Sequence, residues 1–450
     1  MNDIKGIHYS EAEFDKNGKL KSDPNVPAGT TDLIVVSHGW NNNRDEAERL
    51  YTRLFGNFVE VTKDDPAIAQ RKLAIVGVIW PAKRFDALMT QVTSSGAQAG
   101  GAASIGAEDA AAAQTAIHAA IDRVAPLFEE AEEKKNLERL RELVPTLEDD
   151  PDSQKKFVET LRQLLDPQNQ YADQRHSEDS SDVFFEGNPQ NIFDNAKQPT
   201  PASATEPATP AAEPKDAGAT DPTGHAAGFL DVISGAANAA SNLLNLTTYF
   251  EMKKRAGTVG KNGVGPLIDK LASDVKSIER IHLMGHSFGG RVVTAAADSS
   301  TTPKVHSLSL LQAAFSHNGF SRSKSGFFRS VIKNKRVAGP VLITHTKNDR
   351  AVGLAYPAAS RISGDSAAGF GDADDEFGGI GSNGAQQMDS GEIFDGANTL
   401  LTVGSKYQFQ AGKVHNLKSD AFIVVPGGGD AHGWVFVPEV AWAISRAIVS

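Results

Sequence analysis

The sequence predicts an α/β fold with a mostly parallel central sheet and helices on both faces. Two continuous apolar runs, Leu33–Val36 and Leu73–Trp80, are typical of strands buried on both faces, and an amphipathic stretch separates them. Strand, helix and strand at this spacing form a βαβ unit, which favours a parallel sheet. Further along, Ile281–Val293 again runs from an apolar strand through a tight turn into small and apolar residues that predict a helix.

Residues 1–82 are expected to form the first part of the core. Residues 1–30 predict a short strand or hairpin with Asn17-Gly18 as its turn. The second apolar run stops at Pro81. Between the two runs, apolar residues at three- and four-residue spacing predict one buried helix face. These residues are Ala47, Leu50, Tyr51, Leu54, Phe55 and Phe58.

Residues 83–260 are expected to form a mainly helical, partly disordered cap inserted into the core. Prolines divide the charged residues 110–165 into short helices. Residues 197–224 are rich in proline, alanine and threonine and predict a flexible linker. The Phe229–Phe250 segment recovers apolar content, mostly small residues. It is expected to pack against other elements, with a lipid-like ligand as the alternative.

Residues 261–450 are expected to complete the core. The pattern predicts a helix at about 264–277 and a final helix from Pro438 to Val449, with proline in its first turn. An irregular insertion rich in glycine, serine and aspartate spans about 357–400. Besides the strand at Ile281, short apolar runs predict three more strands, which are Val305–Leu311, Val341–Thr346 and Ala421–Val425.

Composition and charge exclude several classes of protein. A net charge of −11 argues against a nucleic-acid partner. The absence of cysteine excludes disulfides, thiolate metal sites and a cysteine nucleophile. Residues 1–8 lack a signal-peptide pattern, and no stretch has the roughly 18 apolar residues of a membrane span. We expect a soluble protein, cytoplasmic or exported without a cleaved signal; the oligomeric state stays open.

The turn Gly285-His286-Ser287-Phe288-Gly289 predicts a nucleophilic serine. A sharp strand-to-helix turn strains the serine backbone and leaves little space beside it, and glycine at both flanking positions satisfies both demands. A serine hydroxyl also needs a base, an acid behind that base and donors for an oxyanion. His286, beside the nucleophile, is expected to give packing or polar support.

The acid and the base are expected on two later strand ends. Asp349 follows the predicted strand at Val341, and His432 lies on a glycine-rich loop after the predicted strand at Ala421. The carboxyl ends of parallel strands meet at one edge of a sheet, where catalytic groups gather. His432 is therefore the predicted base and Asp349 the predicted acid, with Asp372 as the competing acid. The rival bases His345 and His317 fit less well, since one lies within a strand and the other precedes the acid.

The oxyanion donors are expected to be backbone N–H groups. One follows the nucleophile, at Phe288, and the other belongs to the loop after the first apolar run, at Trp40 or at the adjacent Gly39. Gly39 would let the backbone approach a substrate closely. His38 in the same loop is expected to be a structural hydrogen-bonding group.

Together, the His-Gly-Trp loop, the Gly-His-Ser-Phe-Gly turn, the strand-end Asp349 and the late His432 resemble the α/β-hydrolase superfamily on its serine esterase/lipase side. The resemblance covers about 31–82 and 260–450, and residues 83–260 stand where such proteins often carry a cap. It implies hydrolysis of a small-molecule or lipid-like carboxylic ester through an acyl-enzyme, without a cofactor.

Other functions stay open at this point. The same residues serve phospholipases, peptidases, thioesterases and acyltransferases. A non-catalytic binding or scaffold protein on a hydrolase fold is the alternative of another class. The acidic stretch at Asp372–Asp375 lacks the glycine of a calcium loop, because Phe377 stands at that position, so no metal is expected.

Overall fold

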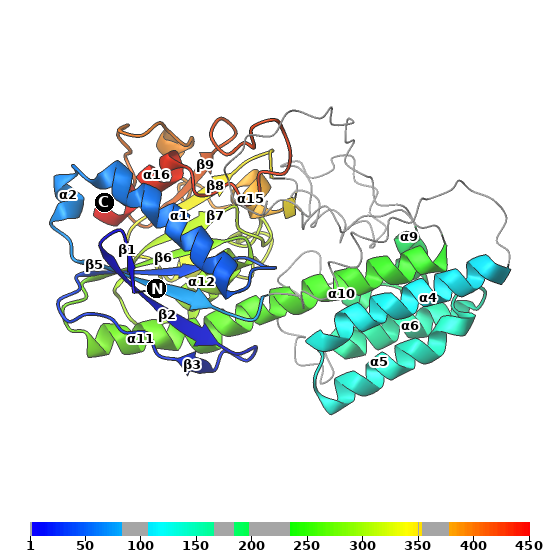
Figure 1. The fold of residues 1–450 in the computed structure, drawn as a ribbon. Coiled ribbons are helices and arrows are strands. Elements are labelled where there is room, and N and C mark those ends of the chain that lie inside the picture. The colour runs from blue at the N-terminus through cyan, green and yellow to red at the C-terminus, as the bar shows by residue number, and fades with distance from the viewer. Residues whose placement is uncertain (1, 83–106, 166–183, 198–234, 350, 353–377) are drawn as a thin grey trace.

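The computed structural model describes residues 2–82, 107–165, 184–197, 235–349, 351–352 and 378–450 (Figure 1). Several predictions lie outside these residues. They are the linker at 197–224 beyond its first residue, residues 229–234, the insertion between 357 and 377, and the competing acid Asp372.

The described residues form one sheet of nine strands in the order β1-β2-β5-β4-β6-β7-β8-β9, with β3 paired to β2. All neighbours from β2 to β9 are parallel, whereas β1 and β3 run antiparallel to β2. The predicted hairpin is present, with Asn17 in its turn. The strands are β1 Asp3–Ile4, β2 Ile7–Phe14, β3 Leu20–Ser22, β4 Asp32–Ser37, β5 Leu73–Ile79, β6 Arg280–His286, β7 Val305–Leu311, β8 Val341–His345 and β9 Val414–Lys418.

Helices cover both faces of the sheet. Successive strand residues point to opposite faces, so Leu33 and Val35 of β4 join one core cluster, whereas Ile34 and Val36 join the other. The first cluster includes buried residues of α11 (Gly265–Asp274) and α12 (Phe288–Ser299), and the second includes those of α1 (Arg44–Thr62) and α16 (Pro438–Val449). This confirms an α/β fold with a mostly parallel sheet.

A capping box begins α1 and closes the loop that follows β4. The Asn43 side chain accepts the Glu46 backbone N–H at 2.8 Å, and the Glu46 carboxylate accepts the Asn43 N–H at 2.7 Å. This arrangement satisfies two donors that a helix start leaves unpaired. The loop from His38 to Asn43 is therefore held at both ends, by the buried strand and by the cap.

A helical bundle lies to one side of the sheet (Figure 1). Its interior is apolar, with Leu140, Phe157, Leu161 and Phe193 fully buried. The short helices expected around the prolines are present. The bundle helices are α4 Ala107–Val124, α5 Ala131–Leu143, α6 Pro151–Leu165, α9 Pro189–Ala196 and α10 Ala236–Thr258, with 3₁₀ turns at Ala125–Leu127 and Val144–Thr146.

Helix α10 links this bundle to the core (Figure 1). It packs on α4, α6 and α9 of the bundle, and it also contacts α12 of the core. The Arg291 Nε–H of α12 donates to the Lys253 carbonyl of α10 at 2.9 Å. Most residues from 236 to 250 are buried, so the packing predicted for this segment is confirmed over its described part.

A π-helical turn, Val259–Val264, joins α10 to α11 and crosses α12 closely. A Cβ on Gly260 would collide with the Val292 carbonyl oxygen and would lie 2.7 Å from the Ala295 Cβ. Glycine is therefore required at this crossing. The π-helical turn after α10 thus contacts the backbone of α12, the helix that follows Ser287.

The strand predicted at Ala421–Val425 is wrong. The last parallel strand is β9, Val414–Lys418, and residues 421–425 form a turn after it. The Ser419 carbonyl accepts the N–H groups of Phe422 and Ile423, so these groups are turned inward and cannot pair with a strand. Ile423 is buried, whereas Val424 is 43% exposed.

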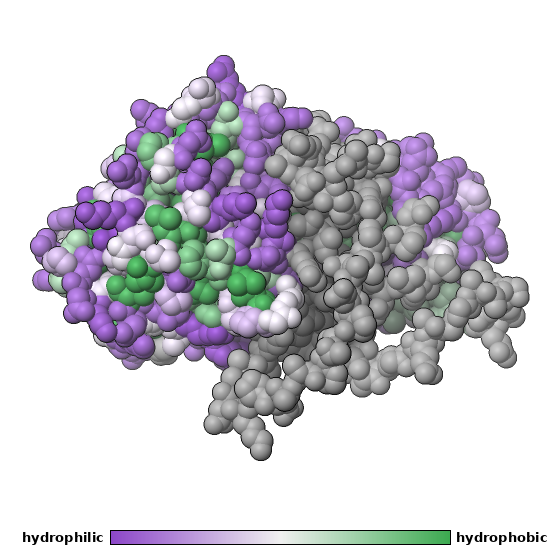
Figure 2. All heavy atoms as spheres, turned by 90° about the horizontal axis from the view of Figure 1, so that it is seen from above, coloured by the Kyte–Doolittle hydropathy of each residue, from purple (hydrophilic) through white to green (hydrophobic). Residues whose placement is uncertain are grey.

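The remaining described elements are short, and they are α2 Pro66–Ala69, α13 Arg329–Lys333, α15 Ile380–Asn383 and the 3₁₀ turn Asp395–Ala397. Seen from above, the face of the core in Figure 2 carries hydrophobic patches among mostly hydrophilic residues. Within the described part of the chain, no helix is both long and apolar enough to cross a membrane.

The close crossing at Gly260 predicts a stability difference between two glycine-to-alanine variants. Gly260→Ala should lower the free energy of unfolding by about 1–3 kcal/mol, because the added methyl group overpacks a backbone contact. Gly56→Ala in α1 should raise it by up to about 1 kcal/mol, since its Cβ would meet only Lys5 at 3.7 Å and alanine favours the helix. Urea titrations measure both; an unchanged midpoint in Gly260→Ala would contradict the close crossing.

Candidate active site

Ser287 lies at a strained turn between β6 and α12. Its φ is 56° and its ψ is −127°, which is unfavourable for a residue with a Cβ and occurs most often at functional sites. Backbone hydrogen bonds hold it there. The Ser287 N–H donates to the Leu311 carbonyl at 3.2 Å, and the Ser287 carbonyl accepts the N–H groups of Gly290 and Ala314, each at 2.9 Å.

The glycines around Ser287 are required by contact. A Cβ on Gly285 would collide with the Gly289 carbonyl, and a Cβ on Gly289 would collide with the Ser37 carbonyl of β4. A Cβ on Gly290 would lie 2.5 Å from the Ala313 Cβ. The turn is therefore wedged between the ends of β4 and β7. This explains why the pattern needs glycine on both sides of the serine.

Asp349 and His432 meet at the carboxyl edge of the sheet. The Nδ1 of His432 lies 2.9 Å from Oδ2 of Asp349, which is 1% exposed. The other carboxylate oxygen accepts the Val352 N–H at 2.9 Å. Because an ionised carboxylate can only accept, Nδ1 carries a proton, and Nε2 of the neutral ring is left as the acceptor.

The electrostatics of this pair favour a protonated imidazole. Burial lowers the pKa of His432, but the charge of Asp349, its hydrogen bond and the nearby Asp430 outweigh burial and raise the pKa above its ordinary value of 6.5. Burial raises the pKa of Asp349, and His432 opposes that rise. A proton taken up by His432 is thus stabilised by the carboxylate behind it.

His432 also contacts the turn that holds Ser287. The His286 Nε2–H donates to the His432 carbonyl at 2.9 Å, and the two imidazole centroids are 4.8 Å apart. Within the described residues, Ser287 Oγ makes no hydrogen bond, so its contact with His432 Nε2 stays a prediction. Such contacts are often long in ligand-free enzymes and shorten when substrate binds.

The loop after β4 lies directly against Ser287. A Cβ on Gly39 would lie 2.6 Å from the Ser287 Cβ, so only glycine fits there. The Trp40 ring meets the Phe288 ring edge-on, with centroids 6.0 Å apart. Phe288 begins α12, where the first backbone N–H groups have no acceptor within the helix. The predicted oxyanion donors therefore belong to segments that adjoin the serine.

His38 makes structural hydrogen bonds in this loop. Its Nδ1 lies 2.9 Å from the Gly39 carbonyl, and its Nε2 accepts the Trp80 N–H at 3.3 Å. Burial lowers the pKa of His38 to about 4, so the ring is neutral near pH 7. The Trp80 ring stacks on it and donates its Nε1–H to the His38 carbonyl at 3.0 Å.

Helix α10 extends this region with an aromatic wall. The Tyr249 ring lies 5.6 Å from the Phe288 ring, measured between centroids, and Phe288 in turn meets Trp40. These three rings connect the bundle, the candidate nucleophile turn and the loop after β4. Phe288 and Tyr249 are buried, and Trp40 is partly exposed.

The rival histidines lie elsewhere. His345 is in β8 with Nδ1 3.4 Å from the Ser382 carbonyl, and His317 is buried beside Asn383. The imidazole that contacts Asp349 is that of His432. Among the residues that the structure describes, no group of three or more histidine or carboxylate side chains could hold a metal ion.

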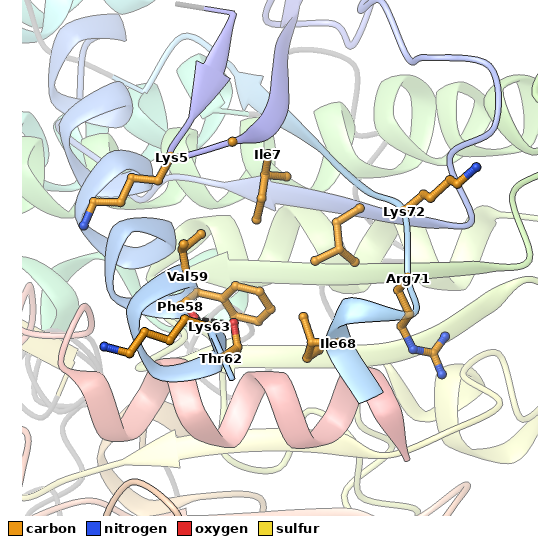
Figure 3. A pocket seen from close by; sticks show the side chains of 11 residues that line it. Lys5, Ile7, Phe58, Val59, Thr62, Lys63, Ile68, Arg71 and Lys72 are labelled. Carbon is orange, nitrogen blue, oxygen red and sulfur yellow. Dashed lines mark hydrogen bonds between the residues drawn. The ribbon is translucent and has the colours of Figure 1, made fainter. Parts of the chain in front are cut away.

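A surface pocket at the other end of the sheet is separate from this site (Figure 3). It is lined by the first residues of β2 and β5, Ile7 and Leu73, and by Phe58 near the end of α1. Lys5 and Lys63 point away from its apolar floor in Figure 3. The candidate catalytic residues follow the carboxyl ends of their strands, so the pocket belongs to the opposite edge.

Sequence reasoning missed two residues that support the loop carrying His432. The Gln312 Nε2–H donates to the Ala431 carbonyl at 3.1 Å, and the Asn348 carbonyl accepts the Ala431 N–H at 2.9 Å. The feature that could have indicated them is their position, because each follows a strand of the parallel sheet at its carboxyl end. Uncharged side chains at such positions are easily taken for ordinary loop residues.

Comparison with protein-family models, with curated proteins and with solved structures gives no match.

The electrostatics predict how the pKa of His432 responds to its two acidic neighbours. In the wild type it should lie above 6.5, and Asp349→Asn should bring it below 6.5, because burial is then left as the largest effect. Asp430→Asn should lower it less, because the charge of Asp430 is the smallest of the effects that raise this pKa. An asparagine there could still accept the His432 backbone N–H that Asp430 accepts at 3.0 Å. NMR titration of ¹³C-labelled histidines, assigned with His432→Gln, measures these shifts. A His432 pKa unaffected by Asp349→Asn would contradict the pairing.

Proposed function

We propose that this protein is a serine hydrolase that cleaves carboxylic esters through an acyl-enzyme intermediate. One observation carries the proposal. The loop that carries an imidazole bonded to a buried carboxylate at 2.9 Å is hydrogen-bonded to His286, the residue before a serine in a strained turn between a strand and a helix. Nucleophilic catalysis by serine requires such a combination of a nucleophile, a base and an orienting acid.

In the first half-reaction, His432 Nε2 takes the hydroxyl proton of Ser287 while Oγ attacks the ester carbonyl carbon. The carbonyl π-electrons move to the oxygen, and the backbone N–H groups of Phe288 and Trp40, or of the adjacent Gly39, stabilise that oxyanion. The tetrahedral intermediate collapses, the bond to the alcohol oxygen breaks, and His432 returns the proton to the leaving alkoxide.

In the second half-reaction, His432 deprotonates a water molecule, which attacks the acyl carbon. Collapse of the second intermediate releases the acid, and Ser287 Oγ regains its proton from His432. Asp349 stays ionised throughout, since it orients the ring and stabilises the imidazolium. The base acts in its neutral form, so activity should fall on acidification through the raised pKa of His432.

We further propose that the core is an α/β-hydrolase fold and that the bundle acts as its cap. The contact of Tyr249 on α10 with Phe288 supports a cap adjoining the site. The Trp40 ring is partly exposed beside the serine turn, and its apolar surface favours an ester with an apolar acyl part. A scaffold protein would need neither a strained serine nor a buried acid–imidazole pair.

Labelling with a fluorophosphonate tests the proposal. The wild type should be labelled at Ser287, because an activated serine attacks the phosphorus, and Ser287→Ala should remove the label. Asp349→Asn should slow turnover of p-nitrophenyl butyrate by roughly 10³- to 10⁴-fold. Gel fluorescence and peptide mapping measure the label.

The matched control is Ser299→Ala on the same helix, whose hydroxyl donates to the Ala296 carbonyl at 3.3 Å. It should be labelled like the wild type. A folded wild type that takes up no label, or a Ser287→Ala variant labelled equally well, would refute the proposed function.

A further inference from the structure

Two buried side chains hold successive carbonyl groups of the loop that carries His432. His286, at the end of β6, donates Nε2–H to the His432 carbonyl at 2.9 Å. Gln312, just after β7, donates Nε2–H to the Ala431 carbonyl at 3.1 Å. The neighbouring strand β8 leads into Asn348, whose carbonyl accepts the Ala431 N–H at 2.9 Å. Three adjacent strands thus fix two consecutive residues.

Hydrogen bonds within the loop join only residues that are close in sequence, such as the Gly428 N–H with the Val425 carbonyl at 3.0 Å and the Trp434 N–H with the Ala431 carbonyl at 2.9 Å. Gly427, Gly428 and Gly429 precede His432, with φ values of 88°, 91° and 125°. A Cβ on either of the first two would meet no atom within 4 Å, so these positions are open on that side. The position of the imidazole therefore depends on bonds that reach the loop from the core.

His286 is suited to this role and not to proton transfer. Burial is the main reason that its pKa is lowered to about 3, which keeps the ring neutral near pH 7. A carbonyl can only accept, so the single ring proton lies on Nε2, and Nδ1 is an acceptor. Within the described residues, that buried Nδ1 has no hydrogen-bond partner. The only hydrogen bond of the ring there is the bond to the His432 carbonyl.

Gln312 is held in an unusual backbone conformation. It is fully buried and has a φ of 42°, in the left-handed region that residues with a Cβ seldom adopt. Its N–H donates to the Thr344 Oγ1 of β8 at 3.2 Å. Such strain persists only where the surroundings impose it, and here it accompanies a side chain aimed at the histidine loop.

We propose that His286 and Gln312 are positioning residues that hold the His432 imidazole within reach of Ser287. Asp349 fixes only the Nδ1 side of the ring, and the backbone behind the ring is fixed by these two donors. The inference rests on the proposed function, because it assigns the two residues a role in that reaction. Neither residue exchanges a proton with substrate.

The test compares His286→Leu, which removes the donor, with His286→Gln, whose amide nitrogen can replace Nε2. With p-nitrophenyl butyrate, His286→Leu should lower kcat by about 10- to 100-fold with little change in KM, because a small displacement of a catalytic group slows the chemical step. His286→Gln should recover most of the loss. Gln312→Met should likewise lower kcat, and the double variant His286→Leu/Gln312→Met should lose less than the product of the single losses.

A partly buried histidine at the other edge of the sheet separates positioning from stability. His306 lies at the opposite end of β7 from Gln312 and contacts the Ser450 carbonyl, with Nε2 3.0 Å from that oxygen. His306→Leu should reduce the urea midpoint while leaving kcat unchanged. Should His286→Leu fail to fold, two Gln312 variants test the positioning role instead. They are Gln312→Met and the matched Gln312→Glu, which replaces the donor by an acceptor, and both should lower kcat.

The outcomes are distinguishable. Wild-type kcat in folded His286→Leu and Gln312→Met, or a His286→Gln variant as slow as His286→Leu, would overturn the positioning role and leave the proposed function standing. A wild type with neither turnover nor fluorophosphonate label would overturn both.

Discussion

The strained backbone of Ser287 is the constraint on which the rest of the site depends. A positive φ at a residue with a Cβ costs on the order of 1–3 kcal/mol and must be imposed by its surroundings. Here Gly285 and Gly289 allow the ends of β4 and β6 and the start of α12 to meet without a side chain between them. The hydroxyl is thereby presented at the carboxyl edge of the sheet. The other groups of the proposed site need only extend from neighbouring strand ends.

Burial and charge then divide the roles among four histidines. His38 and His286 lose their charge to burial, which lowers the pKa of each, and both make hydrogen bonds that shape loops. His432 is partly buried, and the carboxylate of Asp349 reverses the effect of burial on its pKa. His306, at the far edge, is lowered to a pKa of about 4 chiefly by burial. Similar rings in and around one sheet therefore differ in their pKa through their partners.

Much of this arrangement was predictable, because it depends on local pattern. Apolar runs placed β4, β5 and β7, and glycine spacing placed the turn at Ser287. The prediction of the last strand was wrong: β9, Val414–Lys418, contains only two apolar residues, Val414 and Leu417, whereas the more apolar run at 421–425 is a turn stabilised by Ser419. Gln312 and Asn348 could not be assigned from sequence, since their roles arise from bonds to the distant residue Ala431.

The central claim is that Ser287 carries the acyl group during turnover. The most direct measurement is rapid-quench mass spectrometry of the protein mixed with p-nitrophenyl butyrate, followed by peptide mapping. We predict a butyryl group on the peptide that contains Ser287, appearing at the rate of the initial burst of p-nitrophenol. Hydrolysis without an acylated Ser287, or with the acyl group on another residue, would contradict the account.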